Sequence, residues 1–361
     1  MESVTNNKDI LITAIGYNSP SGTGLESFIK QINSQHTETG KEIDVIDPQL
    51  YLGTKGIKFL NKATRMYCNV AFQCIEEQQL KQHIEASADK IGLYDCSDLS
   101  NIQDGFLFDL TAKVEGPDSV SPMSAPNTIA NASSSQMAIK SNIKGPNFTV
   151  CSGACSSLQA LDIANLHLKQ GIINHAIVGS TEVVAKYQEA VRRGEKRGTD
   201  KNSNEVAVAM LLQRRDELTG EKQYARVLGF QSGTQLLEEN PEELVQRLIN
   251  QAISQHPEFP VDLIVVGGGY HNLNLQSFET KLAAKVPVAY PESLLGSGDN
   301  AGGMLGVLYA IGIFRNEIKE VVQLSRQDDF VKKEIDTRSI GNVLVCTIDK
   351  TGYALVTLIT K

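Results

Sequence analysis

The stretch GPNFTVCSGACSSLQAL, residues 145–161, decides how this chain is interpreted. It opens with a β-rich run, Asn147 to Val150, which breaks at small residues. A helical pattern follows, and its apolar face carries Leu158, Leu161, Ala164 and Leu168. Many enzymes present a nucleophile on a strand that turns through small residues directly into a buried helix. The N-terminus of such a helix offers unpaired N–H groups and a positive dipole end to a thiolate or an oxyanion.

Strands and helices alternate on both sides of this stretch. Apolar runs predict strands at residues 9–15, 176–182, 206–212, 224–230 and 262–266. Helical spacing of apolar residues predicts helices near residues 59–74, 128–140, 240–252 and 300–314. A hairpin is predicted between strands at 343–348 and 353–359. The pattern is typical of an α/β protein.

The composition excludes several classes of function. The 361 residues are 41% apolar, which is enough for a large core in one domain or two fused halves. A net charge of −8 argues against binding nucleic acid, and against this chain being the main docking surface for another acidic protein. The sequence has no apolar run of membrane-spanning length and no apolar signal-peptide region at residues 1–8. Its six cysteines lack the paired spacing of a disulfide framework or a zinc site. We therefore expect a cytoplasmic protein that holds no metal.

The central stretch resembles the β-ketoacyl synthases of the thiolase superfamily. That family shares a Gly-Pro opening, a strand and a small-residue turn that carries a cysteine, and the resemblance extends over essentially the whole chain. It implies an α/β fold of the thiolase type, with two pseudo-symmetric βαβαβ-type halves in alternating helix and sheet layers. The halves are expected at residues 1–215 and 216–361, within one compact unit.

The resemblance assigns catalytic positions to particular residues. Aligned without gaps from the Gly-Pro opening, the nucleophilic cysteine of the family falls on Ala154. The first histidine of the family falls on Gly267, while its lysine and second histidine fall on Glu292 and Ser297. The C-terminal gating loop corresponds to residues 348–352 and keeps little of the family pattern. Four substitutions at independently anchored positions imply a chain that does not condense acyl units and needs no cofactor.

A degenerate ketosynthase of this kind resembles the chain length factor (ketosynthase-β) of type II polyketide synthases. The resemblance implies a heterodimer with an active ketosynthase-α in polyketide or polyene biosynthesis. The active partner would supply the cysteine and both histidines. It would also carry most of the contact with acyl carrier protein and its phosphopantetheine-bound acyl chain. Most chain length factors have glutamine at the nucleophile position, whereas this sequence has Ala154.

The resemblance also places residues 121–150 at the dimer interface and along the acyl tunnel. The tunnel and interface residues expected from it are Met123, Ser124, Ala130, Asn131, Ser133 and Ser134. The run from Ala130 to Gln136 is unusually small and polar for a buried helix. Small residues there are compatible with close helix packing and equally with room for a growing acyl chain.

Two alternatives remain open. In the first, Cys155, His271 and Asn300 act as a Cys-His-Asn triad in an active acyltransferase or condensing enzyme. A shift of one residue along a helix rotates a side chain by about 100° and moves it ~1.5 Å, more than catalytic placement tolerates, so this alternative requires a changed turn. In the second, the chain is a catalytically silent structural module that binds acyl ligands.

Overall fold

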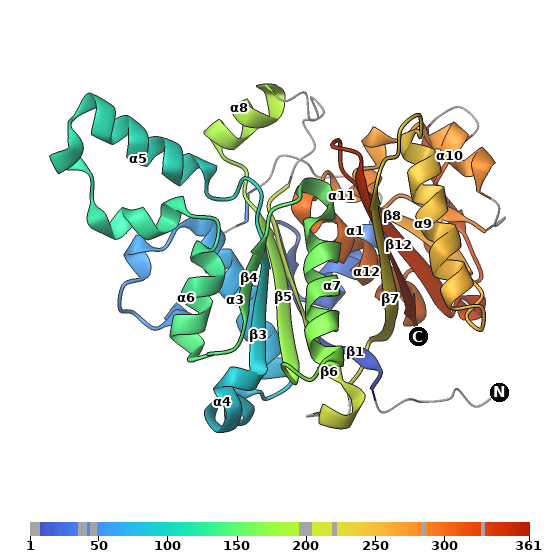
Figure 1. Cartoon of the computed structure of the whole chain (residues 1–361), viewed down its shortest axis with the longest axis horizontal. Helices are drawn as coiled ribbons and strands as arrows, with labels where there is room; N and C mark the ends of the chain where they lie inside the picture. Colours follow the sequence, from blue (N-terminus) through green and yellow to red (C-terminus); the bar gives the residue numbers. More distant parts are fainter. Residues whose placement is uncertain are drawn as a thin grey trace.

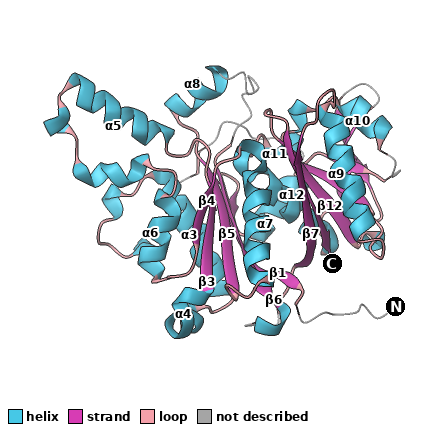
Figure 2. Cartoon of the chain, viewed as in Figure 1, coloured by secondary structure: helices cyan, strands magenta, loops and turns pink. Residues whose placement is uncertain are grey.

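The computed structural model of the chain describes residues 8–34, 42–43, 49–194, 204–218, 222–282, 286–325 and 329–361. Two halves of one large sheet enclose a helical layer, and further helices cover their outer faces (Figure 1). Figure 2 shows the resulting alternation of helix and sheet layers.

The first half of the sheet has the strand order β4-β3-β5-β6-β1. In it, β3 (Ile91–Cys96) lies parallel to β4 (Asn147–Val150) and to β5 (His175–Glu182). The next strand, β6 (Val206–Arg214), is antiparallel both to β5 and to β1 (Ile10–Ser19). Strand β4 stands at the edge and pairs only with β3 among the described residues.

The second half has the order β9-β8-β12-β13-β7. Here β8 (Leu263–Gly268) lies parallel to β9 (Val288–Ala289) and to β12 (Asn342–Ile348). Strand β13 (Tyr353–Thr360) is antiparallel to β12 and to β7 (Ala225–Thr234). The halves repeat one order and one set of directions, and they join where β1 pairs with β7. The division near residue 215, which falls between β6 and β7, stays a prediction.

Helices fill the space between the sheet halves and cover both outer faces. The central layer contains α1 (Leu25–Asn33), α7 (Ser156–Lys169) and α12 (Gly302–Phe314). The first outer face carries α3 (Lys62–Glu77) and α6 (Ala132–Ser141), and the second carries α9 (Pro241–Gln255) and α10 (Leu275–Lys281). The remaining helices and strands are α2 (Gln49–Leu52), α4 (Lys81–Ser87), α5 (Ile102–Val114), α8 (Lys186–Gly194), α11 (Glu292–Leu295), β2 (Gly22–Thr23), β10 (Glu320–Leu324) and β11 (Phe330–Glu334).

In two of these helices, the residue types match the surroundings of the helix in the structure. Every residue of α12 is buried, because this helix lies between the two sheet halves and has no polar face. Helix α9 begins with a capping box, in which Asn240 accepts from the Glu243 N–H and the Glu243 carboxylate accepts from the Asn240 N–H. None of the helices in the described ranges is long and apolar enough to cross a membrane.

Several predicted bounds differ from the structure. The strand predicted at residues 9–15 continues to Ser19, because β2 pairs with its end. The helix predicted at 128–140 begins only at Ala132, since residues 122–128 form a 3₁₀ segment that contains two prolines. The strand predicted at 262–266 continues to Gly268. This last difference moves Gly267 from a loop into β8, which changes the candidate site.

Candidate functional site

The candidate site lies where β4 turns into α7. Residues 153–155 form a short 3₁₀ turn before the helix, and Gly153 takes a φ of +58°, a left-handed conformation that suits glycine. Ala154 is half-buried, and its methyl group stands at the position that the resemblance gives to a nucleophilic cysteine. The strand–turn–helix predicted from the sequence is confirmed.

A carboxylate from the second half of the chain lies against this turn. Asp349 follows β12 and is buried. Its Oδ2 accepts a hydrogen bond from the Ala154 N–H at 3.2 Å. Its Oδ1 accepts from the N–H and the hydroxyl of Thr351, at 2.9 and 2.7 Å. A Cβ added at Gly153 would overlap this carboxylate, so glycine is needed there for space as well as for conformation.

Cys155 faces away from solvent. Its side chain is fully buried, and its Sγ donates to the carbonyl of Tyr353 at 3.3 Å. Burial raises the pKa of this thiol to about 12, an effect that the nearby Asp349 carboxylate reinforces. The thiol is therefore protonated at neutral pH, and a protonated thiol is a poor nucleophile.

The other two members of the alternative triad have different surroundings. His271 lies in a short 3₁₀ turn after β8 and is exposed. Asn300 is fully buried: its side chain donates to the Cys96 carbonyl at 3.3 Å and accepts from the hydroxyl of Ser180. Within the described part of the chain, no hydrogen bond joins Cys155, His271 and Asn300 to one another.

Backbone atoms pack closely around Gly267, the residue at the position of the family's first histidine. Gly267 lies near the end of β8, and a Cβ added there would lie 2.9 Å from the Gly302 carbonyl and 3.2 Å from the Gly306 Cα. Gly306 is itself in contact with this strand, since its added Cβ would lie 2.9 Å from the Gly267 Cα. Glycines on α12 thus bring the helix against the strand, leaving no room for an imidazole at residue 267.

Glu292 connects the two loops that would have carried the histidines. Its carboxyl accepts from the Gly269 N–H at 3.1 Å and from the Gly298 N–H at 3.0 Å. Burial raises the pKa of this carboxyl to about 8, against the opposing effect of the two N–H donors. Ser297, in the second of these loops, donates to the Asp299 carboxylate at 3.2 Å. Both residues stabilise loop conformation in this structure.

The predicted tunnel and interface residues fall into two groups. Met123, Ser124 and Asn131 are exposed and Ala130 is half-buried, whereas Ser133 and Ser134 are buried. The hydroxyl of Ser134 lies 3.3 Å from that of Thr149 on β4, and the hydroxyl of Ser133 lies 3.4 Å from that of Thr64 on α3. The two serines pack α6 against its neighbours, which favours the close-packing interpretation for them.

Sequence reasoning placed Ala154, Gly267, Glu292 and Ser297 in this region but missed Asp349. The resemblance put residue 349 in the gating loop, but the turn it contacts lies 195 residues earlier in the sequence, so periodicity does not join the two. In the described ranges, no group of three or more His, Cys, Asp or Glu residues is arranged to hold a metal ion.

Comparisons with known proteins agree with this architecture. Residues 33–209 match the family described as "Beta-ketoacyl synthase, N-terminal domain". The 3-oxoacyl-[acyl-carrier-protein] synthase 2 of Coxiella burnetii (strain RSA 493 / Nine Mile phase I) is 25% identical over 194 residues, which cover 49% of this chain and 46% of that protein. The matched part is thus less than half the length of this curated relative.

Two solved structures are similar over almost the whole chain. The ishigamide ketosynthase/chain length factor gives a TM-score of 0.75 at 18% identity, covering 98% of this chain and 99% of that chain. A type II PKS acyl-carrier protein in complex with its ketosynthase bound to the hexaketide also gives 0.75, at 11% identity and with coverage of 98% and 99%. At these identities the likeness establishes the fold, and the predicted thiolase-like α/β class is confirmed.

Proposed function

We propose that this chain, whose residues 33–209 match the β-ketoacyl synthase N-terminal domain family, is a non-catalytic, chain length factor-like subunit. It pairs with an active ketosynthase and shapes the acyl tunnel in type II polyketide or polyene biosynthesis. The single observation that carries the proposal is the turn before α7. There an alanine stands at the expected nucleophile position, and the carboxylate of Asp349 accepts its N–H.

The rest of the site supports the same conclusion. A condensing ketosynthase needs a thiolate to accept the acyl group and imidazoles to stabilise the enolate oxyanion. Ala154 and Gly267 carry no such groups, and α12 leaves no space for one at Gly267. The nearest thiol, Cys155, is buried and protonated. Acyl transfer by this chain alone therefore lacks both a nucleophile and an electrostatic site.

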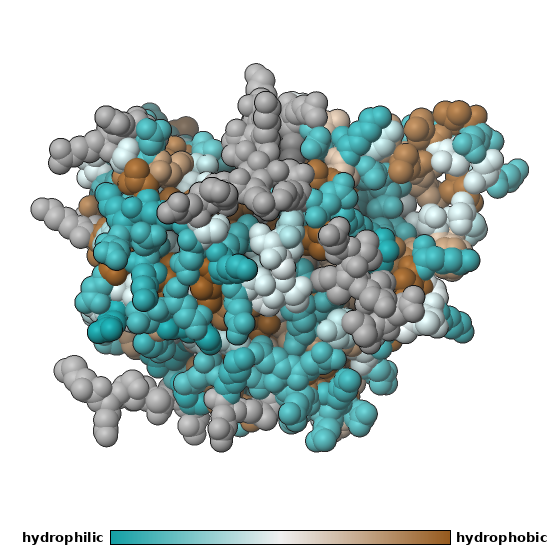
Figure 3. All heavy atoms as spheres, turned by 180° about the vertical axis from the view of Figure 1, so that it is seen from behind, coloured by the Kyte–Doolittle hydropathy of each residue, from teal (hydrophilic) through white to brown (hydrophobic). Residues whose placement is uncertain are grey.

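A concentration of exposed apolar side chains in one segment supports pairing with another chain. Eight exposed apolar side chains come from one segment, residues 102–150, and we call this set the 102–150 surface: Phe106, Leu107, Leu110, Val114, Met123, Ile129, Ile139 and Phe148. Helix α5, which contributes four of them, has no buried residue and projects from the molecule (Figure 1). From behind, apolar residues gather at the same projecting end (Figure 3). Apolar patches of this kind mark interaction sites.

The edge strand β4 belongs to the same surface. Asn147 to Val150 pair with β3 on one side only, and Phe148 is exposed. An exposed edge strand with apolar neighbours favours pairing with another strand or aggregation unless something covers it. A partner ketosynthase that covers the 102–150 surface would prevent both unwanted strand pairing and aggregation. An obligate interface on this scale buries more than ~2,000 Å².

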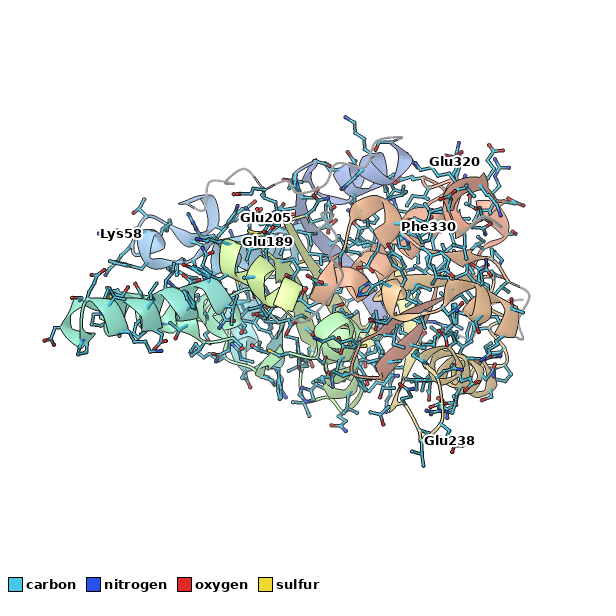
Figure 4. The ribbon with its side chains drawn as sticks, turned by 90° about the horizontal axis from the view of Figure 1, so that it is seen from above. Lys58, Glu189, Glu205, Glu238, Glu320 and Phe330 are labelled. Carbon is cyan, nitrogen blue, oxygen red and sulfur yellow. The ribbon has the colours of Figure 1, made fainter. Side chains whose placement is uncertain are left out.

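The first test is co-expression with a ketosynthase that keeps its cysteine and both histidines and is encoded beside this chain. We expect the two chains to co-purify as a 1:1 heterodimer. Ile139→Glu should abolish co-purification without unfolding the chain, because the Ile139 side chain is 71% exposed. Leu237→Glu is the matched control. Leu237 is 95% exposed, and its neighbour Glu238 lies at the far end of the molecule from α5 (Figure 4). A chain that remains monomeric, or an Ile139→Glu variant that pairs normally, contradicts the proposal.

The second test concerns chemistry. The purified chain, incubated with acyl-acyl carrier protein and malonyl-acyl carrier protein, should form no condensed product. Intact-mass measurement should detect no acyl adduct. A stable adduct that disappears in Cys155→Ser would instead support the active enzyme that uses Cys155, His271 and Asn300. Tight binding of free acyl chains without heterodimer formation would support the silent acyl-binding module.

A further inference from the structure

The Asp349 carboxylate lies where an acyl group would need a hydrogen bond. In acyl transfer, the backbone N–H of the nucleophilic residue stabilises the oxygen of the carbonyl under attack. At the corresponding position of this chain, the Ala154 N–H already donates to the Asp349 Oδ2 at 3.2 Å. A substrate oxygen could reach that N–H only by displacing the carboxylate.

The loop after β12 holds this carboxylate firmly. Its other oxygen, Oδ1, accepts from the Thr351 N–H and hydroxyl at 2.9 and 2.7 Å. The Asp349 N–H donates to the Tyr353 carbonyl at 2.8 Å, and the Gly352 N–H donates to the Asp349 carbonyl at 3.0 Å. Three donors on the carboxylate and two further backbone bonds fix a tight turn, so displacement would disrupt the entire connection between β12 and β13.

The charge of the carboxylate suits its place. Helix α7 runs for 14 residues from Ser156, and the positive end of its dipole faces the turn at residues 153–155. A carboxylate there receives the stabilisation that the helix would otherwise give to a thiolate or an acyl oxyanion. The close approach also depends on Gly153, since any side chain at that residue would overlap Asp349.

We propose that Asp349 is an internal occupant of the acyl-oxygen position, a carboxylate that keeps the former catalytic turn closed and unreactive. Restoring a thiol at residue 154 is then insufficient to restore reactivity, because the charge of Asp349 opposes the thiolate and occupies its electrostatic site. The inference rests on the proposed function only for the assignment of Ala154 to the nucleophile position.

The test measures the reactivity of a thiol introduced by Ala154→Cys, in a Cys151→Ser background because Cys151 is exposed. Iodoacetamide is the probe: the Sγ–carbon bond forms as iodide leaves, and the thiol proton passes to solvent. Site-resolved mass spectrometry follows the rate at pH 7.5. Adding Asp349→Asn should raise the rate roughly tenfold, which corresponds to a fall of one unit in thiol pKa. Asp349→Ala, which also removes the acceptor, should raise it at least as much.

Asp262→Asn is the matched control. Asp262 accepts from the Gly341 and Asn342 N–H groups at 2.8 and 2.9 Å, so it fixes a turn in the same way, but it lies before β8, at the opposite end of that strand from the site. It should leave the rate unchanged. Equal rates with and without Asp349→Asn overturn the proposal, as does an equal increase from Asp262→Asn.

Hydrogen exchange in the unsubstituted chain provides a measurement that needs no variant. The Ala154 amide precedes the first turn of α7 and has no acceptor of its own in that helix. Protection of this amide supports the contact with Asp349, and rapid exchange overturns it. Neither outcome bears on whether a heterodimer forms. Likewise, failure to form a heterodimer would not change the expected alkylation rates.

Discussion

At the scale of single residues, the buried Glu292 stands where the resemblance places a catalytic lysine, and it makes structural contacts that a lysine could not make. Lysine was the residue expected from the resemblance. Here a carboxyl accepts from two backbone N–H groups, those of Gly269 and Gly298, which no ammonium group could do. The identity of this residue could be read from the sequence. Its partners could not, because they depend on loop conformations set by Gly269, at a φ of +77°, and by the packing of α12.

A second buried titratable residue, His175, leads to a prediction about pH. It lies at the start of β5 between Ile91 and Gln213, and neither ring nitrogen has a hydrogen-bond partner among the described residues. Burial, together with the smaller effect of His83, whose ring centroid is 5.3 Å away, lowers the pKa of its imidazole to about 4. The unfolded chain therefore binds a proton between about pH 6.5 and pH 4 that the folded chain does not, and stability falls as the pH falls through this window.

We expect His175→Leu to weaken this acid sensitivity. Between pH 7 and pH 5, the free energy of unfolding of the unsubstituted chain should fall by roughly 2 kcal/mol more than that of the variant. Urea unfolding at the two pH values measures the difference. His271→Leu, which replaces an exposed histidine, should keep the original pH dependence. If His175→Leu shows the same loss as the unsubstituted chain, the buried imidazole is not the source of the effect.

At the scale of helices and strands, the contact between β8 and α12 depends on glycines. The prediction that β8 ends at residue 266 was wrong because the glycines at 267 and 268 read as a loop, whereas they continue the strand. Gly267, Gly302 and Gly306 allow backbone to approach backbone within a buried layer. Hydrophobic periodicity identifies helices and strands in a sequence, but it does not reveal backbone contacts between glycines. Periodicity therefore located many of the strands and helices, but it missed β3 and α5 and could not give contacts of this kind.

Gly306→Ala tests this contact. The added methyl group would lie 2.8 Å from the Val345 Cγ1 and 2.9 Å from the Gly267 Cα. We expect a loss of about 1–3 kcal/mol in the free energy of unfolding, measured by urea titration, despite the better helix propensity of alanine. Gly105→Ala is the control. Gly105 also lies within a helix, α5, but an added Cβ there would lie 3.9 Å from the Thr128 carbonyl oxygen, which is an ordinary contact distance. That change should be neutral or stabilising by about 0.5–1 kcal/mol.

At the scale of the whole molecule, the repeated strand order places unlike surfaces at the two ends of the sheet. In the first half the end strand is β4, which contacts α6 and comes from the same segment as the exposed apolar residues of α5. In the second half it is the two-residue β9, and short edge strands are a common protection against unwanted pairing. The sequence indicated the two halves and the segment 121–150. The extension of the apolar surface back to α5 was not predicted, because periodicity cannot tell a buried helix from a projecting one.

The location of residues within the segment 121–150 decides how chain length should be tested. Ser134 is fully buried, and its hydroxyl is hydrogen-bonded to that of Thr149. Ser134→Phe would therefore overpack the core around α6 and lower the free energy of unfolding by about 1–3 kcal/mol. Ala130 lies before α6, is half-buried, and belongs to the same segment as Met123, which is 53% exposed. If the partner's tunnel ends against this segment, a larger side chain here stops the growing acyl chain earlier. We therefore expect Ala130→Phe to shorten the product of the heterodimer by at least one two-carbon unit, as measured by mass spectrometry.

Met123→Ala should act in the opposite direction, because it removes volume from the same surface. The yield of heterodimer must be measured for each variant, so that a loss of pairing is not taken for a change in product. Leu237→Glu, at the other end of the molecule, should leave the products unchanged. Normal assembly combined with an unaltered product distribution in both Ala130→Phe and Met123→Ala would mean that this segment does not bound the tunnel. Its small residues would then be explained by the packing of α6 against α3 and β4 alone.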